Sequence, residues 1–264
     1  MMKVAGLQLD ISWQEPAINL ERAELWIRRA ADQGAKLITL PEMFATGFSM
    51  DVGRASAARM ETEDLLRRLA TSLQVTLIAG TAEVLGGDSG GRGANVALLV
   101  DPEGGVHTYH KIHPFSFAGE HERYQGGDRV LTVSCGETKV SPFVCYDLRF
   151  PEIFRAVAES THLIVVIASW PDLRGYAWRS LLVARAIENQ CYVLGVNRVG
   201  EGGGQSYRGD SMLIDPLGEV MASARGAEGI VGGEVDVAHV EQVRGRFPFL
   251  RDRRVELYHQ LLGR

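Results

Sequence analysis

Three reactive side chains lie far apart in the sequence, and each follows an apolar run that is typical of a β-strand. Glu42 occurs in TLPEMF, Lys111 in HTYHKIHPF and Cys145 in FVCYDLRFPE. A thiol attacks a carbonyl carbon well only as thiolate or with a base beside it. A carboxylate, an ammonium group and a thiol that meet where strands end therefore have the chemistry to hydrolyse an amide without a metal or cofactor.

Cys145 has two interpretations. Free cysteine is among the most buried residue types, so its apolar neighbours alone are equally compatible with a side chain that fills space in the core. The apolar run breaks immediately into DLRFPE, however, which indicates a turn from a strand into a helix. Such turns expose a side chain and direct backbone N–H groups at a ligand, so we predict that Cys145 is a nucleophile.

The other polar residues are predicted to act in the same reaction as Cys145. We predict that Glu42 takes the thiol proton, returns it to the leaving amine and activates the water that cleaves the thioester. Lys111 and the backbone N–H of Tyr146 would hold the oxyanion. Glu120, in FSFAGEHERY, would orient Lys111 or position the substrate amide. Taken singly, a glutamate or a lysine is more often a solvated surface residue, and any chain contains such residues.

A second chemistry is compatible with the same residues. His113 or His121 would act as the base for Cys145 in a cysteine–histidine hydrolase. This alternative predicts that replacing either histidine by alanine abolishes activity, whereas Glu42→Ala is tolerated.

The predicted elements alternate between strands and helices, with several strands arranged as hairpins. This mixture favours one mixed sheet or a pair of sheets covered by helices. Strands are predicted at residues 4–9, 36–40, 75–82, 95–100, 106–109, 140–146, 163–169, 191–197, 211–214, 219–222 and 230–235. Helices are predicted to begin at Pro16 and end at Gly34, and to span residues 61–73, 151–159 and 176–189.

Composition excludes several classes of partner. The chain has 264 residues, a net charge of −5 and no basic block, so neither nucleic acid nor an anionic membrane is an expected partner. The longest apolar stretch, residues 163–168, is far too short to cross a bilayer, and the start MMKVAGLQLD becomes polar too soon for a signal peptide. Three cysteines without metal-ligand spacing or a disulfide framework fit the reducing cytoplasm.

Four segments taken together resemble the nitrilase, or carbon–nitrogen hydrolase, superfamily over residues 4–235. They are LITLPEMFATGF, YHKIHPFSFAGEHERYQGGD, PFVCYDLRFPEIFR and ARAIENQCYVLGVNRVG, in the order and spacing of that family. The segments FSFAGEHERY and ASWP (168–171) resemble the bacterial ω-amidase branch.

The resemblance implies an α/β fold, a four-layer α-β-β-α sandwich with two mixed sheets, which pairs with a second subunit to give an eight-layer core. It implies Glu42 as base, Lys111 as transition-state stabiliser and Cys145 as nucleophile, with Glu120 as the second glutamate beside the lysine. It also implies cleavage of the distal amide of 2-oxo acid amides, such as 2-oxoglutaramate or 2-oxosuccinamate, to a dicarboxylic 2-oxo acid and ammonia.

Such substrates carry a carboxylate, so a cation is expected at the far end of the pocket. Arg174 is the candidate, although a solvated loop arginine is an equally good interpretation. Arg149 is expected to pair with a carboxylate such as Glu152 or to lie at a subunit contact, and not to bind substrate. Aromatic residues more often belong to a core than to a binding site. The candidates for apolar pocket walls are Phe117, Tyr124, Trp170 and Tyr176.

Two alternative functions remain open at this point. One is a nitrilase or N-carbamoyl-amino-acid hydrolase of the same superfamily, and the other is a non-catalytic binding member. No linker or composition shift divides the chain, so residues 1–264 are predicted to form one domain. The polar and basic tail, residues 240–264, is predicted to contact the partner in a homodimer or higher homo-oligomer.

Overall fold

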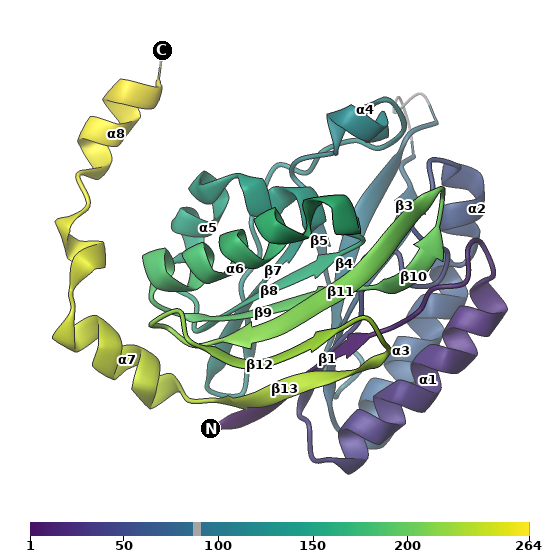
Figure 1. Cartoon of the computed structure of the whole chain (residues 1–264), viewed down its shortest axis with the longest axis horizontal. Coiled ribbons are helices and arrows are strands. Elements are labelled where there is room, and N and C mark those ends of the chain that lie inside the picture. Colours follow the sequence, from purple (N-terminus) through teal and green to yellow (C-terminus); the bar gives the residue numbers. More distant parts are fainter. Residues whose placement is uncertain (87–90, 264) are drawn as a thin grey trace.

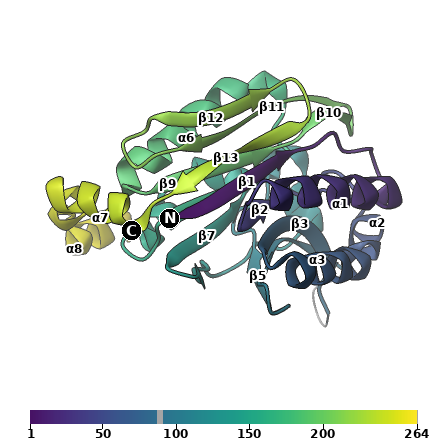
Figure 2. The same cartoon turned by 90° about the horizontal axis from the view of Figure 1, so that it is seen from below.

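The computed structural model describes residues 1–86 and 91–263, which form two β-sheets packed face to face with helices on both outer sides (Figures 1 and 2). One sheet has the order β13 (Gly229–Val235), β1 (Met2–Gln8), β2 (Leu37–Thr39), β3 (Thr76–Val84), β4 (Gly93–Val100) and β5 (Val106–His110). The other has the order β10 (Val199–Gly202), β11 (Gln205–Ile214), β9 (Tyr192–Asn197), β8 (Leu163–Ala168), β7 (Thr138–Val144) and β6 (Val133–Cys135), and β12 (Val220–Arg225) pairs with β11.

Helices complete the outer layers. Figure 2 shows α1 (Pro16–Asp32) and α3 (Arg59–Leu73) on one side of the sheets and α6 (Gly175–Asn189) on the opposite side. The remaining helices are α2 (Val52–Ala57), α4 (Glu120–Arg123), α5 (Pro151–Val157), α7 (Val237–Arg246) and α8 (Val255–Leu262). The predicted α-β-β-α sandwich with two mixed sheets is therefore confirmed. That all 264 residues form one domain stays a prediction.

Side chains that alternate along the strands form two separate cores. On β1, Val4 belongs to the core between the sheets, whereas Ala5 and Leu7 pack toward α1 and α3. Ile27 of α1 and Leu66 of α3 close that second core. Since a strand covered on both faces needs no polar positions, these strands read as continuous apolar runs in the sequence.

The chain direction brings the ends of four strands to one edge of the sandwich. β1, β2 and β3 are parallel, as are β7, β8 and β9. β5 runs antiparallel to β4, which runs antiparallel to β3, so β5 points the same way as β3. Ligand sites in open α/β sheets lie outside the carboxyl ends of the strands. Glu42, Lys111, Cys145 and Ser169 follow β2, β5, β7 and β8 at these ends.

Three predicted segments differ from the structure. The strand expected over residues 140–146 ends at Val144, and Cys145–Arg149 form a 3₁₀ helix, η3. The predicted strands leave residues 198–210 outside any element, but Val199–Gly202 form β10, which makes a hairpin with β11. Strand β11 begins at Gln205 and is therefore longer than the predicted strand over residues 211–214. Its first residues are polar, and backbone pairing with β10, not an apolar pattern, keeps them in the strand.

The C-terminal segment extends away from the sandwich. Figure 1 shows the chain leaving β13 through α7 and ending in α8, clear of both sheets. Helix α7 keeps Val240 and Val243 buried, but the segment beyond it exposes apolar side chains, including Phe249 and Leu261. Within the described part of the chain, no helix has the length and apolar character needed to cross a membrane.

Candidate active site

Glu42 is buried at the end of β2 because the chain approaches β3 very closely there. A Cβ at Gly80 of β3 would lie only 2.5 Å from the Glu42 Cα, so this contact requires glycine. The Glu42 side chain is 0% exposed. Its Oε1 accepts hydrogen bonds from Lys111 Nζ at 3.0 Å and Asn95 Nδ2 at 2.7 Å, and its Oε2 accepts one from the Ser169 backbone N–H at 2.8 Å.

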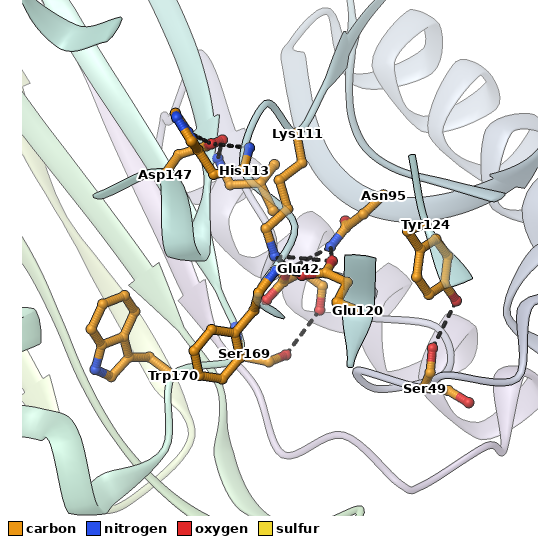
Figure 3. Close-up of polar contacts among 12 residues, drawn as sticks. Glu42, Ser49, Asn95, Lys111, His113, Glu120, Tyr124, Asp147, Ser169 and Trp170 are labelled. Carbon is orange, nitrogen blue, oxygen red and sulfur yellow. Dashed lines mark hydrogen bonds and ion pairs between the residues drawn. The ribbon is translucent and has the colours of Figure 1, made fainter. Parts of the chain in front are cut away.

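Lys111 connects two carboxylates in the interior (Figure 3). Its Nζ lies 3.0 Å from Glu42 Oε1 and 2.8 Å from Glu120 Oε2, and the side chain is 1% exposed. Burial by itself would lower the pKa of Lys111, but the charges of Glu120 and Glu42 outweigh it and raise that pKa. The two carboxylates therefore favour the charged form of the lysine. Its Nζ also lies 5.2 Å from the ring centroid of Phe48, a cavity-lining residue.

Glu120 joins this cluster from the start of α4. Its Oε1 accepts from Asn95 Nδ2 at 2.8 Å, and its Oε2 accepts from Lys111 and from the backbone N–H of Phe115. Burial raises the pKa of Glu120, the Lys111 charge lowers it, and the Glu42 charge raises it again. Glu120 thus holds the lysine and also anchors the segment that carries Phe115 at the cavity wall.

Cys145 lies where β7 turns into the 3₁₀ helix. Its φ of 49° is in the left-handed region, a strained conformation for a residue with a side chain and one that recurs at nucleophile turns. Burial raises the pKa of the Cys145 thiol well above its ordinary value; the Glu42 charge raises it further and Lys111 opposes this. The thiol therefore forms thiolate less readily than a free cysteine, and attack on a carbonyl calls for a base beside it. The Tyr146 N–H follows in the first helical turn, where N–H groups have no helical partner.

The histidines proposed as alternative bases have other positions. His113 Nδ1 lies 2.9 Å from Asp147 Oδ1, and its ring stacks on Phe150 with centroids 3.8 Å apart. His121 is exposed on α4. Asp147 is buried and also accepts the Val144 N–H, so the His113–Asp147 pair braces the turn before Cys145. The geometry thus favours Glu42 over either histidine as the base.

A cavity of about 550 Å³ opens above Cys145. Its lining includes Cys145, Tyr146 and Ser169, so the proposed nucleophile borders the cavity. Its walls are largely aromatic, and they include Trp13, Phe48, Phe115, Phe117, Trp170 and Tyr207. A partly open cavity with largely apolar walls and a few polar lining groups is typical of a small-molecule pocket.

The predicted wall residues divide into two groups. Phe117 and Trp170 line the cavity, as expected. Tyr124 does not: its ring packs with Met43 and its hydroxyl donates to the Ser49 carbonyl at 2.7 Å, directed away from the lysine (Figure 3). Tyr176 is 80% exposed on the first turn of α6 and does not line the cavity. The expectation that these two tyrosines form pocket walls is therefore corrected.

Two arginines line the cavity. Arg174 follows β8 as expected, and its guanidinium lies over the Phe115 ring at 5.2 Å. Arg149 also lines the cavity, with its guanidinium 5.0 Å from the Trp170 ring centroid, so its expected pairing with Glu152 is corrected. Within residues 1–86 and 91–263, neither guanidinium has a carboxylate within salt-bridge distance, and no Asp or Glu lines the cavity. The cavity therefore favours an anionic ligand.

The sequence predictions missed Asn95 and Ser169. Asn95 is a buried polar residue in the apolar strand GANVALLV, and this contrast is the signal that could have identified it. Ser169 contributes through its backbone N–H, which residue type does not reveal. In the described part of the chain, no group of His, Cys, Asp and Glu side chains is arranged to hold a metal ion.

Comparisons with known proteins identify the family of this chain. The family model described as carbon-nitrogen hydrolase matches residues 3–245. The omega-amidase YafV of Escherichia coli is 37% identical over 95% of this chain and 96% of its own length. A 2-oxoglutaramate amidase of Bacillus subtilis is 33% identical over 97% of this chain and 98% of its own.

Solved structures show the same architecture. A CN-hydrolase superfamily protein of Xanthomonas campestris, with an arsenic adduct in its active site, has a TM-score of 0.88 and 34% identity over 96% of this chain and 97% of that one. An amidase of Nesterenkonia sp., with acrylamide added to its active-site cysteine, has a TM-score of 0.86 and 26% identity over 99% of this chain and 100% of that one. This chain belongs to the carbon–nitrogen hydrolase family.

Proposed function

We propose that the protein is an ω-amidase, which hydrolyses the distal amide of 2-oxo acid amides such as 2-oxoglutaramate or 2-oxosuccinamate. The observation that carries the proposal is that Cys145 lines the cavity and interacts electrostatically with the buried Glu42–Lys111–Glu120 cluster. Arg149 and Arg174 line the same cavity, and neither has a carboxylate partner among the described residues. The names of the relatives in Escherichia coli and Bacillus subtilis support the same substrate class.

The reaction proceeds through a thioester. Glu42 takes the Cys145 proton while sulfur attacks the amide carbon, and Lys111 with the Tyr146 N–H stabilises the oxyanion. The intermediate collapses as Glu42 protonates the departing ammonia. Glu42 then deprotonates a water molecule that attacks the thioester carbon, which releases the dicarboxylic acid and restores the thiol.

A substrate panel tests this function. Ammonia release is measured from 2-oxoglutaramate, 2-oxosuccinamate, an aliphatic nitrile and an N-carbamoyl amino acid. We expect the kcat/KM of a 2-oxo acid amide to exceed those of the others by on the order of 100-fold, because the site matches an amide and a carboxylate together. Preference for the nitrile or the ureido acid would assign the alternative function, and no turnover of any compound would support a binding role.

Arg174 is proposed to bind the substrate carboxylate, with Arg149 beside it. We expect Arg174→Gln to raise the KM for 2-oxoglutaramate by roughly 10- to 100-fold while kcat changes little, because a charged hydrogen bond in a partly enclosed site is lost. Steady-state kinetics measure both constants. Arg129→Gln, at a side chain 88% exposed, is the matched control and should change neither.

Turnover of a neutral aliphatic amide distinguishes a loss of carboxylate binding from a change in the shape of the cavity. Arg174→Gln should leave the weak turnover of such a substrate unchanged, since it has no carboxylate to bind. An equal loss for the neutral amide would show that Arg174 only maintains the cavity, and an unchanged KM for 2-oxoglutaramate would remove Arg174 from the site.

We further infer a homodimer in the cytoplasm, in which the free thiols of Cys135, Cys145 and Cys191 persist. The C-terminal segment supports the assembly, because Phe249 is 62% and Leu261 is 59% exposed. The double variant F249S/L261S should sediment as a monomer while the unmodified chain sediments as a dimer. A dimer in both cases would place the interface elsewhere, and a monomer in both would refute the assembly.

A further inference from the structure

Asn95 has a position that the proposed mechanism does not use. It lies in β4, between apolar residues, and is 2% exposed. Its backbone carbonyl accepts the Lys111 N–H at 2.9 Å, so it fixes where the lysine leaves β5. Figure 3 shows its side chain directed at the two carboxylates around the Lys111 ammonium.

The amide nitrogen of Asn95 serves both carboxylates. Nδ2 lies 2.7 Å from Glu42 Oε1 and 2.8 Å from Glu120 Oε1, and an amide nitrogen has one hydrogen for each. Asn95 Oδ1 is buried and has no hydrogen-bond partner among the described residues. The opposite amide orientation would set this oxygen against two carboxylate oxygens, so the hydrogen-bond network fixes the orientation.

The two carboxylate oxygens of Glu42 therefore differ in the number of hydrogen bonds that they accept. Oε1 accepts from both Asn95 and Lys111, which occupies its two lone pairs. In the part of the chain that the structure describes, Oε2 accepts a single backbone N–H, from Ser169 at 2.8 Å, and keeps one lone pair. A proton arriving from a thiol can therefore bind to Oε2 without displacing a hydrogen bond.

We propose that Asn95 is a positioning residue that, together with Lys111, saturates Glu42 Oε1 and leaves Oε2 to carry the proton in each step. In the first step, the S–H bond of Cys145 breaks, an O–H bond forms on Oε2, and the sulfur electron pair attacks the amide carbon. The C=O electron pair moves to the oxygen as the C–S bond forms. When it returns, the C–N bond breaks and the Oε2 proton passes to the departing nitrogen, which leaves as ammonia. The inference rests on the roles proposed for Glu42 and Cys145 but not on the identity of the substrate.

Charge explains why an amide occupies this position. Glu42, Glu120 and Lys111 together carry one net negative charge when both carboxylates are ionised, and all three are buried. Asn95 supplies two donors without adding charge, whereas aspartate would add a third acid. Hydrogen bonds to ionised carboxylates favour their charged form, so Asn95 helps to keep the cluster deprotonated.

Asn95→Leu tests the proposal, since leucine has a similar size and branching but no donor. We expect kcat to fall by roughly 10- to 100-fold with KM changed less than about threefold, because proton transfer is affected and substrate contact is not. The acidic limb of the pH–kcat profile should move up by about one pH unit, because the cluster then holds a proton to higher pH. Alkylation of Cys145 by iodoacetamide at neutral pH should slow similarly.

Asn189→Leu is the matched control. Asn189 is also a fully buried asparagine with an unpaired Oδ1, and its Nδ2 donates to the Arg185 carbonyl in α6. This variant should keep kcat within about twofold and leave the pH profile in place. If Asn95→Leu does not fold, Asn95→Thr carries the test, because threonine suits a strand and keeps one donor; its effects should be intermediate.

The results for the Asn95 variants can be interpreted independently of the results of the substrate panel. An unchanged acidic limb, or a kcat loss no larger than that of Asn189→Leu, overturns the role of Asn95. If 2-oxoglutaramate is not a substrate, the alkylation rates still test Asn95, because they need no turnover. Unchanged Cys145 alkylation in Asn95→Leu would then overturn the proposal.

Discussion

Cys145→Ala should abolish ammonia release, with a loss in kcat on the order of 10⁵-fold or more, because no other group can form the thioester. The fold should persist, since the substitution removes one sulfur beside an open cavity. A coupled ammonia assay measures turnover, and thermal unfolding checks the fold. Cys191→Ala, at a buried core residue just before β9, should remain active and serves as the control.

Alkylation distinguishes this outcome from a binding-only protein. Burial raises the pKa of Cys135 to about 11 and that of Cys191 to about 12, so neither thiol forms thiolate readily. The pKa of Cys145 is also raised well above its ordinary value, by burial and by Glu42. If Glu42 acts as its base, Cys145 should nevertheless label fastest, and more slowly in Glu42→Gln. Labelling of Cys145 no faster than of Cys135 would indicate a binding member, and full turnover by Cys145→Ala would refute the thioester mechanism.

Lys111→Met should produce the second large effect, on activity and stability together. Loss of an oxyanion donor typically costs about 100- to 1,000-fold in kcat. The substitution also leaves Glu42 and Glu120 buried without a counter-charge, which should lower the free energy of unfolding by roughly 3–5 kcal/mol. Kinetics and urea unfolding measure the two effects. Lys139→Met, at an exposed lysine on β7, is the control.

The pH dependence of stability has a definite sign. The pKa of the Glu120 carboxyl is raised on folding, so this group binds its proton more tightly in the folded state than in the unfolded state. The free energy of unfolding therefore falls as the pH rises above the ordinary pKa of a glutamate. Without Lys111 this fall should steepen. Lys111 itself has a raised pKa, so its contribution is present below its ordinary pKa of 10.5 and is lost only above it. Urea midpoints for Lys111→Met should therefore be lower at pH 8 than at pH 5.

A double variant isolates the uncompensated charge. Adding Glu120→Gln to Lys111→Met removes one buried carboxylate and should recover part of the stability without recovering activity. If the single variant is as stable as the unmodified protein, Lys111 is not balancing the two carboxylates. If the double variant gains nothing, the loss comes from packing and not from charge.

The sequence by itself determined the fold class and the reactive side chains of this protein. Runs such as residues 163–168 are apolar throughout because both faces of the strand are buried, and this signal survives without coordinates. Glu42, Lys111 and Cys145 were identifiable because each is a reactive group placed just after such a run. That these strand ends share one edge is a finding of the structure, in which β2 runs parallel to β3 and β7 runs parallel to β8.

Only the tertiary structure decided which other residues surround them. Side-chain direction depends on local backbone conformation and on distant contacts, neither of which residue type fixes. Tyr124 contacts Ser49 and Tyr176 is exposed to solvent. Arg149 lines the cavity from the end of η3, which begins where β7 ends, before the predicted strand end at residue 146. Asn95 joins the site because pairing between β4 and β5 sets it beside Lys111, and such pairing links residues through hydrogen bonds that no local pattern encodes.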